Sequence, residues 1–420
     1  MTTATIAVEA RDGDVGHHEA MLGGQRALRV LIYAVCLASA TFQQGIVPLL
    51  PAYAHRFGLS GVETGMLLAA TALSTMAVSL PAGALSDRLG ARRLTILAGW
   101  LMAAAMLVEA FAPSFSVLLL ARLVFGTGYG IVWTAGLAWL AGVSPQGSGL
   151  GGTVAASGVG GILGPLLAGS LAGLVGMAAP FYMAAAVFLS LTMLLSWLRL
   201  PNPARERAPS GFRSSAGGML RNRGIVVAAA AVVVAGLTWS VTYLLGPQEL
   251  HASGVSTATI GLVLSAAAAV FVIGSMATTS FGQRAVRARW ILLAIAGAAV
   301  AFVPGIVGSA PFAITAMICA AAVARSVLWT VCYPLAARGA ERMGIGVGVV
   351  MGFLQAVWAT TSVISPLAAG GLAGVLSSRQ IFALGLFGCL AILAGTVAWV
   401  SRHPLGAWLR GALARTNLAA

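Results

Sequence analysis

The stretch GALSDRLGARR, residues 83–93, places four charged side chains between two long apolar segments. These side chains belong to Asp87, Arg88, Arg92 and Arg93. Charge is sparse elsewhere, because only 8% of the 420 residues are charged while 59% are hydrophobic. A soluble globule with a mean hydropathy of +0.95 would lack the polar surface to cover its core. We therefore predict a membrane protein in which residues 83–93 link two membrane helices.

Apolar runs of about 20 residues, the length that crosses a bilayer as a helix, recur on both sides of this loop. Short polar or Pro/Gly-containing breaks separate them. We predict an all-α polytopic membrane protein with twelve transmembrane helices. The predicted spans are 27–52, 62–84, 94–112, 115–141, 148–176, 179–199, 224–246, 256–280, 290–308, 311–337, 345–376 and 380–401.

The arginines predict the orientation of these helices. All 24 basic residues are arginine, and the formal net charge is +14. With the N-terminus inside, 20 arginines fall in the tails and cytoplasmic loops, where positive charge is retained, and only Arg56 and Arg379 fall outside. We predict a multi-pass protein of the cytoplasmic (inner) membrane with both termini cytoplasmic. Basic residues confined to short gaps between apolar runs argue against a nucleic-acid-binding face.

The longest interior loop is rich in Pro, Gly, Ser and Arg, which is typical of a linker. It predicts two six-helix bundles. The predicted boundaries are a cytoplasmic tail at 1–26, the first bundle at 27–199, the linker at 200–223, the second bundle at 224–401 and a cytoplasmic tail at 402–420.

The two halves contain a repeated segment. GPLLAGSLAG at 164–173 and SPLAAGGLAG at 365–374 match at seven of ten positions, and each lies in the fifth span of its half. Segments rich in Ala, Gly and Leu also match by chance, but the equivalent placement favours an internal duplication.

The sequence contains no motif for catalysis or for a bound metal. Cys36, Cys319, Cys332 and Cys389 lie in apolar runs, without the paired spacing of a metal site or a disulfide framework. His17 and His18 could bind a metal in principle, but they fall in a segment that lacks the features of a cleaved signal peptide and is better interpreted as a disordered tail. There is no HExxH motif and no acidic metal cluster. We expect no enzyme activity, no metal and no cofactor.

Two six-helix halves, joined by a basic loop and carrying a charged turn after the second helix, resemble the major facilitator superfamily of secondary transporters. The superfamily signature between helices two and three has Gly, then Asp-Arg, then Gly and a basic cluster. It is matched by Gly83, Asp87, Arg88, Gly90, Arg92 and Arg93, and only Ala91 departs, where a third basic residue is common. The resemblance covers nearly the whole chain and is closest to the twelve-helix drug:proton antiporter branch. It implies the major facilitator fold of two pseudo-symmetric bundles.

The charged turn has a predicted role in gating. Its arginines are expected to anchor the loop at the cytoplasmic membrane face. Asp87 is expected to lie against the positive N-terminal end of a helix of the other half, near Gly344. Such a contact would latch the outward-open state. Ordinary positive-inside charge would account for the arginines but not for Asp87.

The segment ARLVFGTGYG, residues 121–130, resembles the family's helix-four motif, although Phe125 replaces the usual Gln. Arg122 lies about 12 Å into its span at 1.5 Å per residue, where an arginine is costly without a partner or water. Glu109 could pair with it across a short hairpin, or could lie at the membrane interface. If protons are coupled, Asp87 and Glu109 acting with Arg122 are the first candidates.

Span five resembles the superfamily's antiporter motif, with Gly160, Gly164 and Pro165 at matching positions and Ala168 in place of one glycine. Gly160, Gly164 and Ala168 recur every four residues, so a neighbouring helix can approach this face closely. Pro165 predicts a bend. Generic packing of small residues is the alternative interpretation, but the association of the motif with antiporters favours export.

In this superfamily the first and fourth helices of each half line the central cavity, which implies spans one, four, seven and ten. Polar or aromatic residues at middle depth in these spans are the predicted substrate-binding residues, although rings at such spacing more often serve packing. They are Gln43, Gln44, Tyr129, Trp133, Trp239, Tyr243, Arg325, Trp329 and Tyr333.

Arg325 differs from the other candidates because it is charged. It lies about 21 Å from the outer end of its span, with no carboxylate predicted at similar depth. An arginine there indicates a water-filled cavity and an anionic or strongly polar substrate group. Pairing with backbone carbonyls at a broken helix is the alternative.

These observations predict proton-coupled efflux of a drug-like compound or metabolite by alternating access. The alternative is uptake or exchange of a small organic anion by symport or uniport, because no Asp or Glu lies at mid-membrane depth in the predicted spans. The expected partners are a small-molecule substrate, protons and the lipid bilayer. We expect no nucleic acid, and a protein that functions as a monomer.

Overall fold

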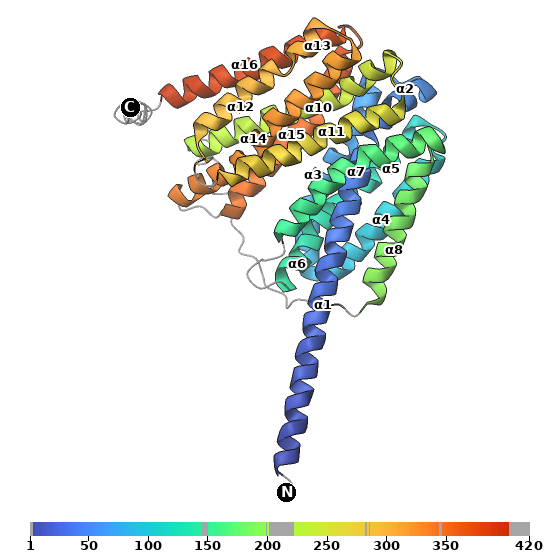
Figure 1. Ribbon diagram of the computed structural model, residues 1–420, viewed down its shortest axis with the longest axis vertical. Coiled ribbons are helices and arrows are strands. Elements are labelled where there is room, and N and C mark those ends of the chain that lie inside the picture. The colour runs from blue at the N-terminus through green and yellow to red at the C-terminus, as the bar shows by residue number, and fades with distance from the viewer. Residues whose placement is uncertain are drawn as a thin grey trace. The chain divides into compact units, whose positions relative to one another are not determined.

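The computed structural model describes residues 3–143, 150–198, 200, 222–281, 284, 286–343 and 347–402. Within these ranges every regular element is a helix, and twelve helices are long and apolar enough to cross a membrane (Figure 1). The predicted all-α polytopic architecture is therefore confirmed. The helices are α1 (Thr3–Gly45), α2 (Leu50–Phe57), α3 (Gly61–Leu89), α4 (Ala91–Phe111), α5 (Phe115–Ile131), α6 (Leu137–Val143), α7 (Leu150–Leu174), α8 (Ala179–Trp197), α10 (Arg223–Ala252), α11 (Thr257–Ser280), α12 (Ala288–Val300), α13 (Val303–Val307), α14 (Pro311–Met343), α15 (Val347–Leu372) and α16 (Ser378–Arg402).

The first span is longer than the predicted 27–52 and is interrupted. The disordered tail predicted before residue 27 is wrong for the described residues, because α1 is continuous from Thr3 to Gly45 and contains good helix formers such as Ala, Glu and Met. After Gly45 the chain passes through a 3₁₀ helix, Val47–Leu49, into α2. Pro51 lies in the first turn of α2, where its missing N–H costs no intrahelical hydrogen bond.

Reciprocal side-chain caps begin α3 and α16. Glu63 Oε2 accepts hydrogen bonds from the backbone N–H and the hydroxyl of Ser60, both at 2.8 Å, and Ser60 Oγ accepts from the Glu63 N–H. Ser377 and Gln380 repeat this arrangement before α16. A capping box of this kind satisfies N–H groups that a helix leaves unpaired at its start. The carboxylate of Glu63 therefore has a structural role.

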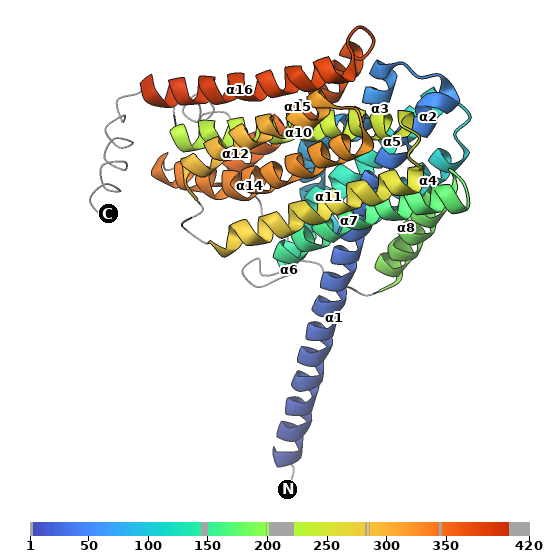
Figure 2. The same ribbon diagram turned by 45° about the horizontal axis from the view of Figure 1, so that its top comes forward.

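The chain divides into two compact units. The first unit comprises Met1–Leu49, Ala70–Ala208 and Thr257–Ser265, and the second comprises Leu50–Ala69, Pro209–Ser256 and Ala266–Ala420. In the first unit α1 packs along α7, and α4 contacts α5 and α8. In the second unit α12, α14 and α16 lie beside α10 (Figure 2). The predicted linker is mostly outside the described residues, so the two six-helix bundles at 27–199 and 224–401 stay a prediction.

The small-residue face of α7 lies against α1. A Cβ atom added to Gly160 would lie 2.6 Å from a backbone carbonyl oxygen of α1, and one added to Gly164 would clash with the carbonyl oxygen of Thr41. By contrast, a Cβ atom added to Gly161 would have no neighbour within 4 Å. The close approach expected for this face is present, and it fixes the segment of α1 that carries Gln43.

The repeated segments make equivalent contacts in the two units. In the first unit, a Cβ atom at Gly261 of α11 would clash with the carbonyl oxygen of Pro165 in α7. In the second unit, a Cβ atom at Gly65 of α3 would clash with the carbonyl oxygen of Pro366 in α15. Pro165 and Pro366 occupy the same position of the repeat. The shared contact supports the predicted duplication.

The four cysteines are free thiols, with Cys36, Cys332 and Cys389 buried and Cys319 partly buried. They behave as small core residues, as their positions in apolar spans predict.

Candidate functional site

A buried ion pair joins α4 to α5. Arg122 Nη1 lies 3.7 Å from Glu109 Oε1, and the two residues are 0% and 1% exposed. The short hairpin between the two helices places the last turns of α4 opposite the first turns of α5. Of the two interpretations of Glu109, the pairing with Arg122 is present. The carboxylate is enclosed by protein rather than exposed.

Two neutral side chains also bind Arg122. Its Nη2 donates hydrogen bonds to Gln43 Oε1 of α1 at 2.9 Å and to Thr71 Oγ1 of α3 at 3.1 Å. Its guanidinium carbon lies 5.2 Å from the ring centre of Phe125. Gly126 allows α3 to approach, since a Cβ atom there would lie 2.7 Å from Thr71 Cα. One arginine thus connects four helices of the first unit.

The other predicted substrate residues of the first unit are neutral. The rings of Tyr129 and Trp133 are 5.9 Å apart. Trp133 lies in a π-helical segment, Val132–Gly136, which the sequence does not predict and which is common at functional sites. Trp133 Nε1 and Gln44 Oε1 are buried and have no hydrogen-bond partner in the described part of the chain. This region therefore offers one donor and one acceptor without a charge.

The charged loop between α3 and α4 turns at Gly90, whose φ of 92° lies in the left-handed region that favours glycine. Arg92 Nη2 donates hydrogen bonds to the carbonyl oxygens of Ser196 at 3.3 Å and Leu198 at 2.9 Å. A basic side chain there satisfies carbonyl groups that the end of α8 leaves unpaired. Arg92 thus ties the loop to the end of the sixth span.

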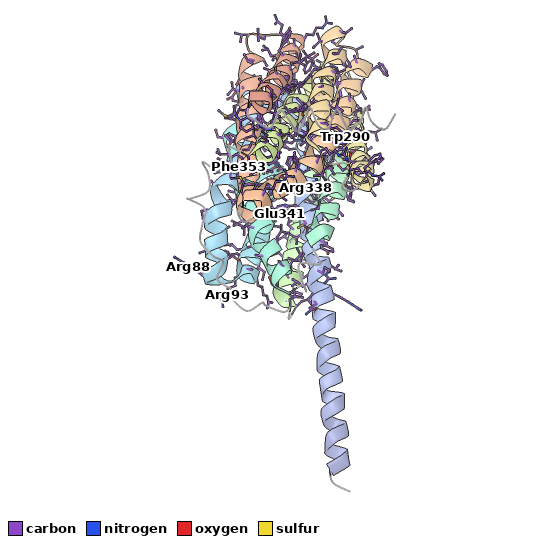
Figure 3. All side chains as sticks on the ribbon, turned by 90° about the vertical axis from the view of Figure 1, so that its left-hand side faces the viewer. Arg88, Arg93, Trp290, Arg338, Glu341 and Phe353 are labelled. Atoms are coloured by element: carbon purple, nitrogen blue, oxygen red, sulfur yellow. The ribbon has the colours of Figure 1, made fainter. Side chains whose placement is uncertain are left out.

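The latch predicted at this loop involves Asp87 and the segment near Gly344. Arg88 and Arg93 are exposed at the adjoining ends of α3 and α4 (Figure 3). The side chain of Asp87 and residues 344–346 lie outside the described residues. A gating role for Asp87, and for the accompanying Gly83, stays a prediction.

The second unit buries a different arginine. Arg325 of α14 is 7% exposed. Its guanidinium carbon lies 5.2 Å from the ring centre of Tyr243 in α10 and 5.8 Å from that of Phe271 in α11. The ring of Trp239 lies one turn before Tyr243, 5.5 Å from it. Among the described residues no carboxylate lies within 4 Å of Arg325, and its Nη1 has no hydrogen-bond partner.

An aromatic row continues from Arg325 along α14. The ring of Trp329 lies 5.4 Å from that of Tyr333 and 6.0 Å from that of Trp358 in α15. Tyr333 Oη donates a hydrogen bond to Gln355 Oε1 at 3.4 Å. The i, i+4, i+8 spacing predicted a shared face for the three α14 residues, but it could not predict their neighbours on α15.

The structure groups the predicted residues by unit. Gln43, Glu109 and Arg122 meet in the first unit, and Tyr243 and Arg325 meet in the second. Sequence reasoning missed four residues that complete these groups, which are Thr71, Phe271, Gln355 and Trp358. Thr71 could have been proposed as a site residue because it is polar and lies in a predicted span. Phe271 gives no such signal, because phenylalanine is common in apolar spans.

The chain resembles known transporters in sequence. It is 33% identical over 171 residues to the quinolone resistance protein NorA of Staphylococcus aureus (strain MRSA252). The alignment covers 40% of this chain and 43% of NorA, so the chain matches less than half the length of this curated relative.

Solved structures show the same fold at low identity. The nucleoside transporter NupG aligns with a TM-score of 0.72 at 12% identity, covering 90% of this chain and 100% of NupG. A bacterial homolog to the human lysosomal transporter Spinster aligns with a TM-score of 0.66 at 16% identity, covering 90% of this chain and 95% of that protein.

The Major Facilitator Superfamily model matches residues 32–351, about three quarters of the sequence. This match agrees with the twelve candidate spans and with the fold of the solved transporters. The chain therefore belongs to the major facilitator superfamily of transporters and is a multi-pass membrane protein.

Proposed function

We propose that the protein is a secondary active transporter that expels a drug-like compound or metabolite across the cytoplasmic membrane in exchange for protons. Its termini are then cytoplasmic, and the functional unit is a monomer. The relation to NorA, whose name records quinolone resistance, supports efflux. The antiporter-like motif of α7, with Gly160, Gly164 and Pro165, supports exchange.

The buried Glu109–Arg122 pair carries the proposal of proton coupling. A carboxylate enclosed in protein is costly unless it is paired or protonated. The 3.7 Å separation is longer than a hydrogen bond, so the pair relies mainly on charge attraction. Arg122 is the only charged group within 4 Å of Glu109 among the described residues. A proton arriving at Glu109 would therefore cancel the attraction that holds these groups together.

Protonation of Glu109 would remove the carboxylate charge from the surroundings of Arg122. Arg122 is hydrogen-bonded to α1 and α3 through Gln43 and Thr71. Loss of the carboxylate charge would weaken the hold on the Arg122 side chain and so change its hydrogen bond to Gln43 of α1. This gives proton binding a direct connection to a helix that carries predicted substrate residues.

The test uses everted membrane vesicles that contain the full-length protein and are energised to build a proton gradient. A pH-sensitive dye reports the gradient while cationic, neutral and anionic compounds are added singly. Dequenching by particular compounds is expected for the wild type and is expected to disappear in Glu109→Gln and in Asp87→Asn. Silence across the whole panel with folded protein in the correct orientation would contradict proton antiport.

Glu63→Gln is the matched control for Glu109→Gln. Glu63 caps α3, and glutamine can make the same capping box. This control removes one carboxylate near the membrane but leaves the buried pair intact. It is expected to transport as the wild type does. Loss of transport in both variants would show that Glu109 has no specific role in proton coupling.

Uptake or exchange of a small organic anion is the second candidate function. The observation that favours it is Arg325, a buried cation with no carboxylate within 4 Å in the described part of the chain. Counterflow of a labelled anion in vesicles without a proton gradient separates this function from antiport. Counterflow that persists in Glu109→Gln would favour the exchanger.

A further inference from the structure

The charge of Arg325 is not neutralised by its surroundings. The side chain is 7% exposed, and it lies fourteen residues after Pro311, the first residue of α14. In the described part of the chain no carboxylate lies within 4 Å of it, and its Nη1 is buried without a hydrogen-bond partner. The predicted alternative, pairing with carbonyls at a broken helix, therefore has no support, since α14 is one continuous helix.

Aromatic rings provide part of the missing stabilisation. The guanidinium carbon lies 5.2 Å from the ring centre of Tyr243 and 5.8 Å from that of Phe271. Ring faces attract the cation, but they do not accept the hydrogen bonds of its N–H groups. Nη1 is buried without an acceptor. The ligand that would complete this environment is an anion with acceptor oxygens.

The geometry of a guanidinium selects the kind of anion. Its planar fork of N–H donors matches the two oxygens of a carboxylate. Position also matters, because α14 rises about 21 Å between its first residue and Arg325 at 1.5 Å per residue. That depth lies well inside a hydrocarbon core about 30 Å thick and away from lipid headgroups. A small-molecule carboxylate therefore fits better than a lipid phosphate.

The residues next to Arg325 on α14 indicate what is attached to the carboxylate. Trp329 is one turn away and lies edge to face with Tyr333 and with Trp358 of α15. Trp329 and Trp358 are partly exposed, so their indoles are not fully used in packing. Large ring faces beside an arginine suit a planar aromatic group.

We propose that Arg325, flanked by Tyr243 and Phe271, binds the carboxylate of the transported compound, and that Trp329 and Trp358 contact its planar aromatic part. The substrate class is thus an aromatic carboxylate. This inference rests on the proposed function, because it names the substrate class of the proposed transporter. It does not depend on the direction of transport or on proton coupling.

Binding to full-length protein purified in detergent, measured by isothermal titration calorimetry, tests the proposal. Three probes share one ring system, and they are 2-naphthoate, its methyl ester and 2-naphthylmethylammonium. The acid is expected to bind at least about tenfold more tightly than the ester, because only its carboxylate brings a negative charge and two equivalent acceptor oxygens to the guanidinium. The ammonium compound is expected to bind most weakly, since it brings a second positive charge to Arg325.

Substitutions then assign the preference to Arg325. Arg325→Gln is expected to lower the affinity for 2-naphthoate to that of the ester, while the ester itself binds as before. Arg325→Lys keeps the charge but lacks the planar fork, so an intermediate affinity is expected. Arg289→Gln is the matched control, because Arg289 also lies over an aromatic ring, Trp290, but is exposed.

Four results would overturn the proposal. The first three are equal binding of acid and ester by the wild type, absence of binding by all three probes, and full affinity for the acid in both Arg325 variants. Competition by phosphatidylglycerol at matched concentration would assign Arg325 to a lipid headgroup and would also overturn it. Binding of the acid without proton-driven efflux would contradict the proposed function alone, so the two failures are distinguishable.

Discussion

Two arginines, each on the predicted fourth span of its half, are buried in different ways. Arg122 in α5 has a carboxylate partner at 3.7 Å and two neutral acceptors. Arg325 in α14 has two aromatic rings and, in the described part of the chain, no carboxylate within 4 Å. Both positions carry the cost of a charge in a membrane span. The chain compensates that cost itself at Arg122, whereas at Arg325 we propose that a ligand compensates it.

This difference predicts unequal effects on stability, and the largest is expected at Glu109. Glu109→Leu leaves the Arg122 charge buried without its counter-ion, which costs about 3–5 kcal/mol of unfolding free energy. The measurement is denaturant unfolding of the detergent-purified protein. The double variant Glu109→Leu with Arg122→Met removes both charges and is expected to recover most of that loss. A double variant as unstable as the single one would show that packing, not charge, dominates at this position.

The next prediction concerns the acceptor on α1. Gln43→Leu removes the 2.9 Å hydrogen bond from Arg122, and hydrogen bonds to charged groups contribute about 1.5–3 kcal/mol. Gln44→Leu is the matched control. Its Oε1 is buried without a hydrogen-bond partner among the described residues, so this change is expected to be neutral or stabilising. The measurement is again the unfolding free energy. Equal losses of unfolding free energy in Gln43→Leu and Gln44→Leu would contradict the hydrogen bond assigned between Gln43 and Arg122.

Packing of α7 on α1 gives a third prediction, because it holds Gln43 in place. Gly164→Ala adds a Cβ atom that clashes with the carbonyl oxygen of Thr41, and overpacking of this kind costs about 1–3 kcal/mol. Gly161→Ala meets no atom within 4 Å and is expected to stabilise α7 slightly through helix propensity. The measurement compares the unfolding free energies of the two variants. A loss in Gly164→Ala alone would show that contact with α1, and not the Gly→Ala change itself, is responsible.

Much of the fold followed from the sequence because span length, charge placement and repeat position depend on local chemistry. The Glu109–Arg122 pair could be considered from sequence because a short hairpin brings the two residues close. The contact of Phe271 with Arg325 and the hydrogen bond of Thr71 with Arg122 could not be predicted in this way. In each case the two residues lie on helices distant along the chain. A helical pattern predicts which residues share a face, but tertiary packing decides what that face meets. The π-helical segment at Trp133 likewise has no sequence signal.

The smallest effect on stability is expected at Arg325 itself. Arg325→Leu loses two cation–π contacts but also removes the cost of burying an uncompensated charge, and these terms should cancel to within about 1 kcal/mol. Added ligand should distinguish the wild type from Arg325→Leu. A bound aromatic carboxylate stabilises the folded protein by mass action, so 2-naphthoate should raise the unfolding midpoint of the wild type more than that of Arg325→Leu. A loss as large as that of Glu109→Leu in the absence of ligand would show that the two arginines are equally structural, and Arg325 would then have no need of a substrate to explain its burial.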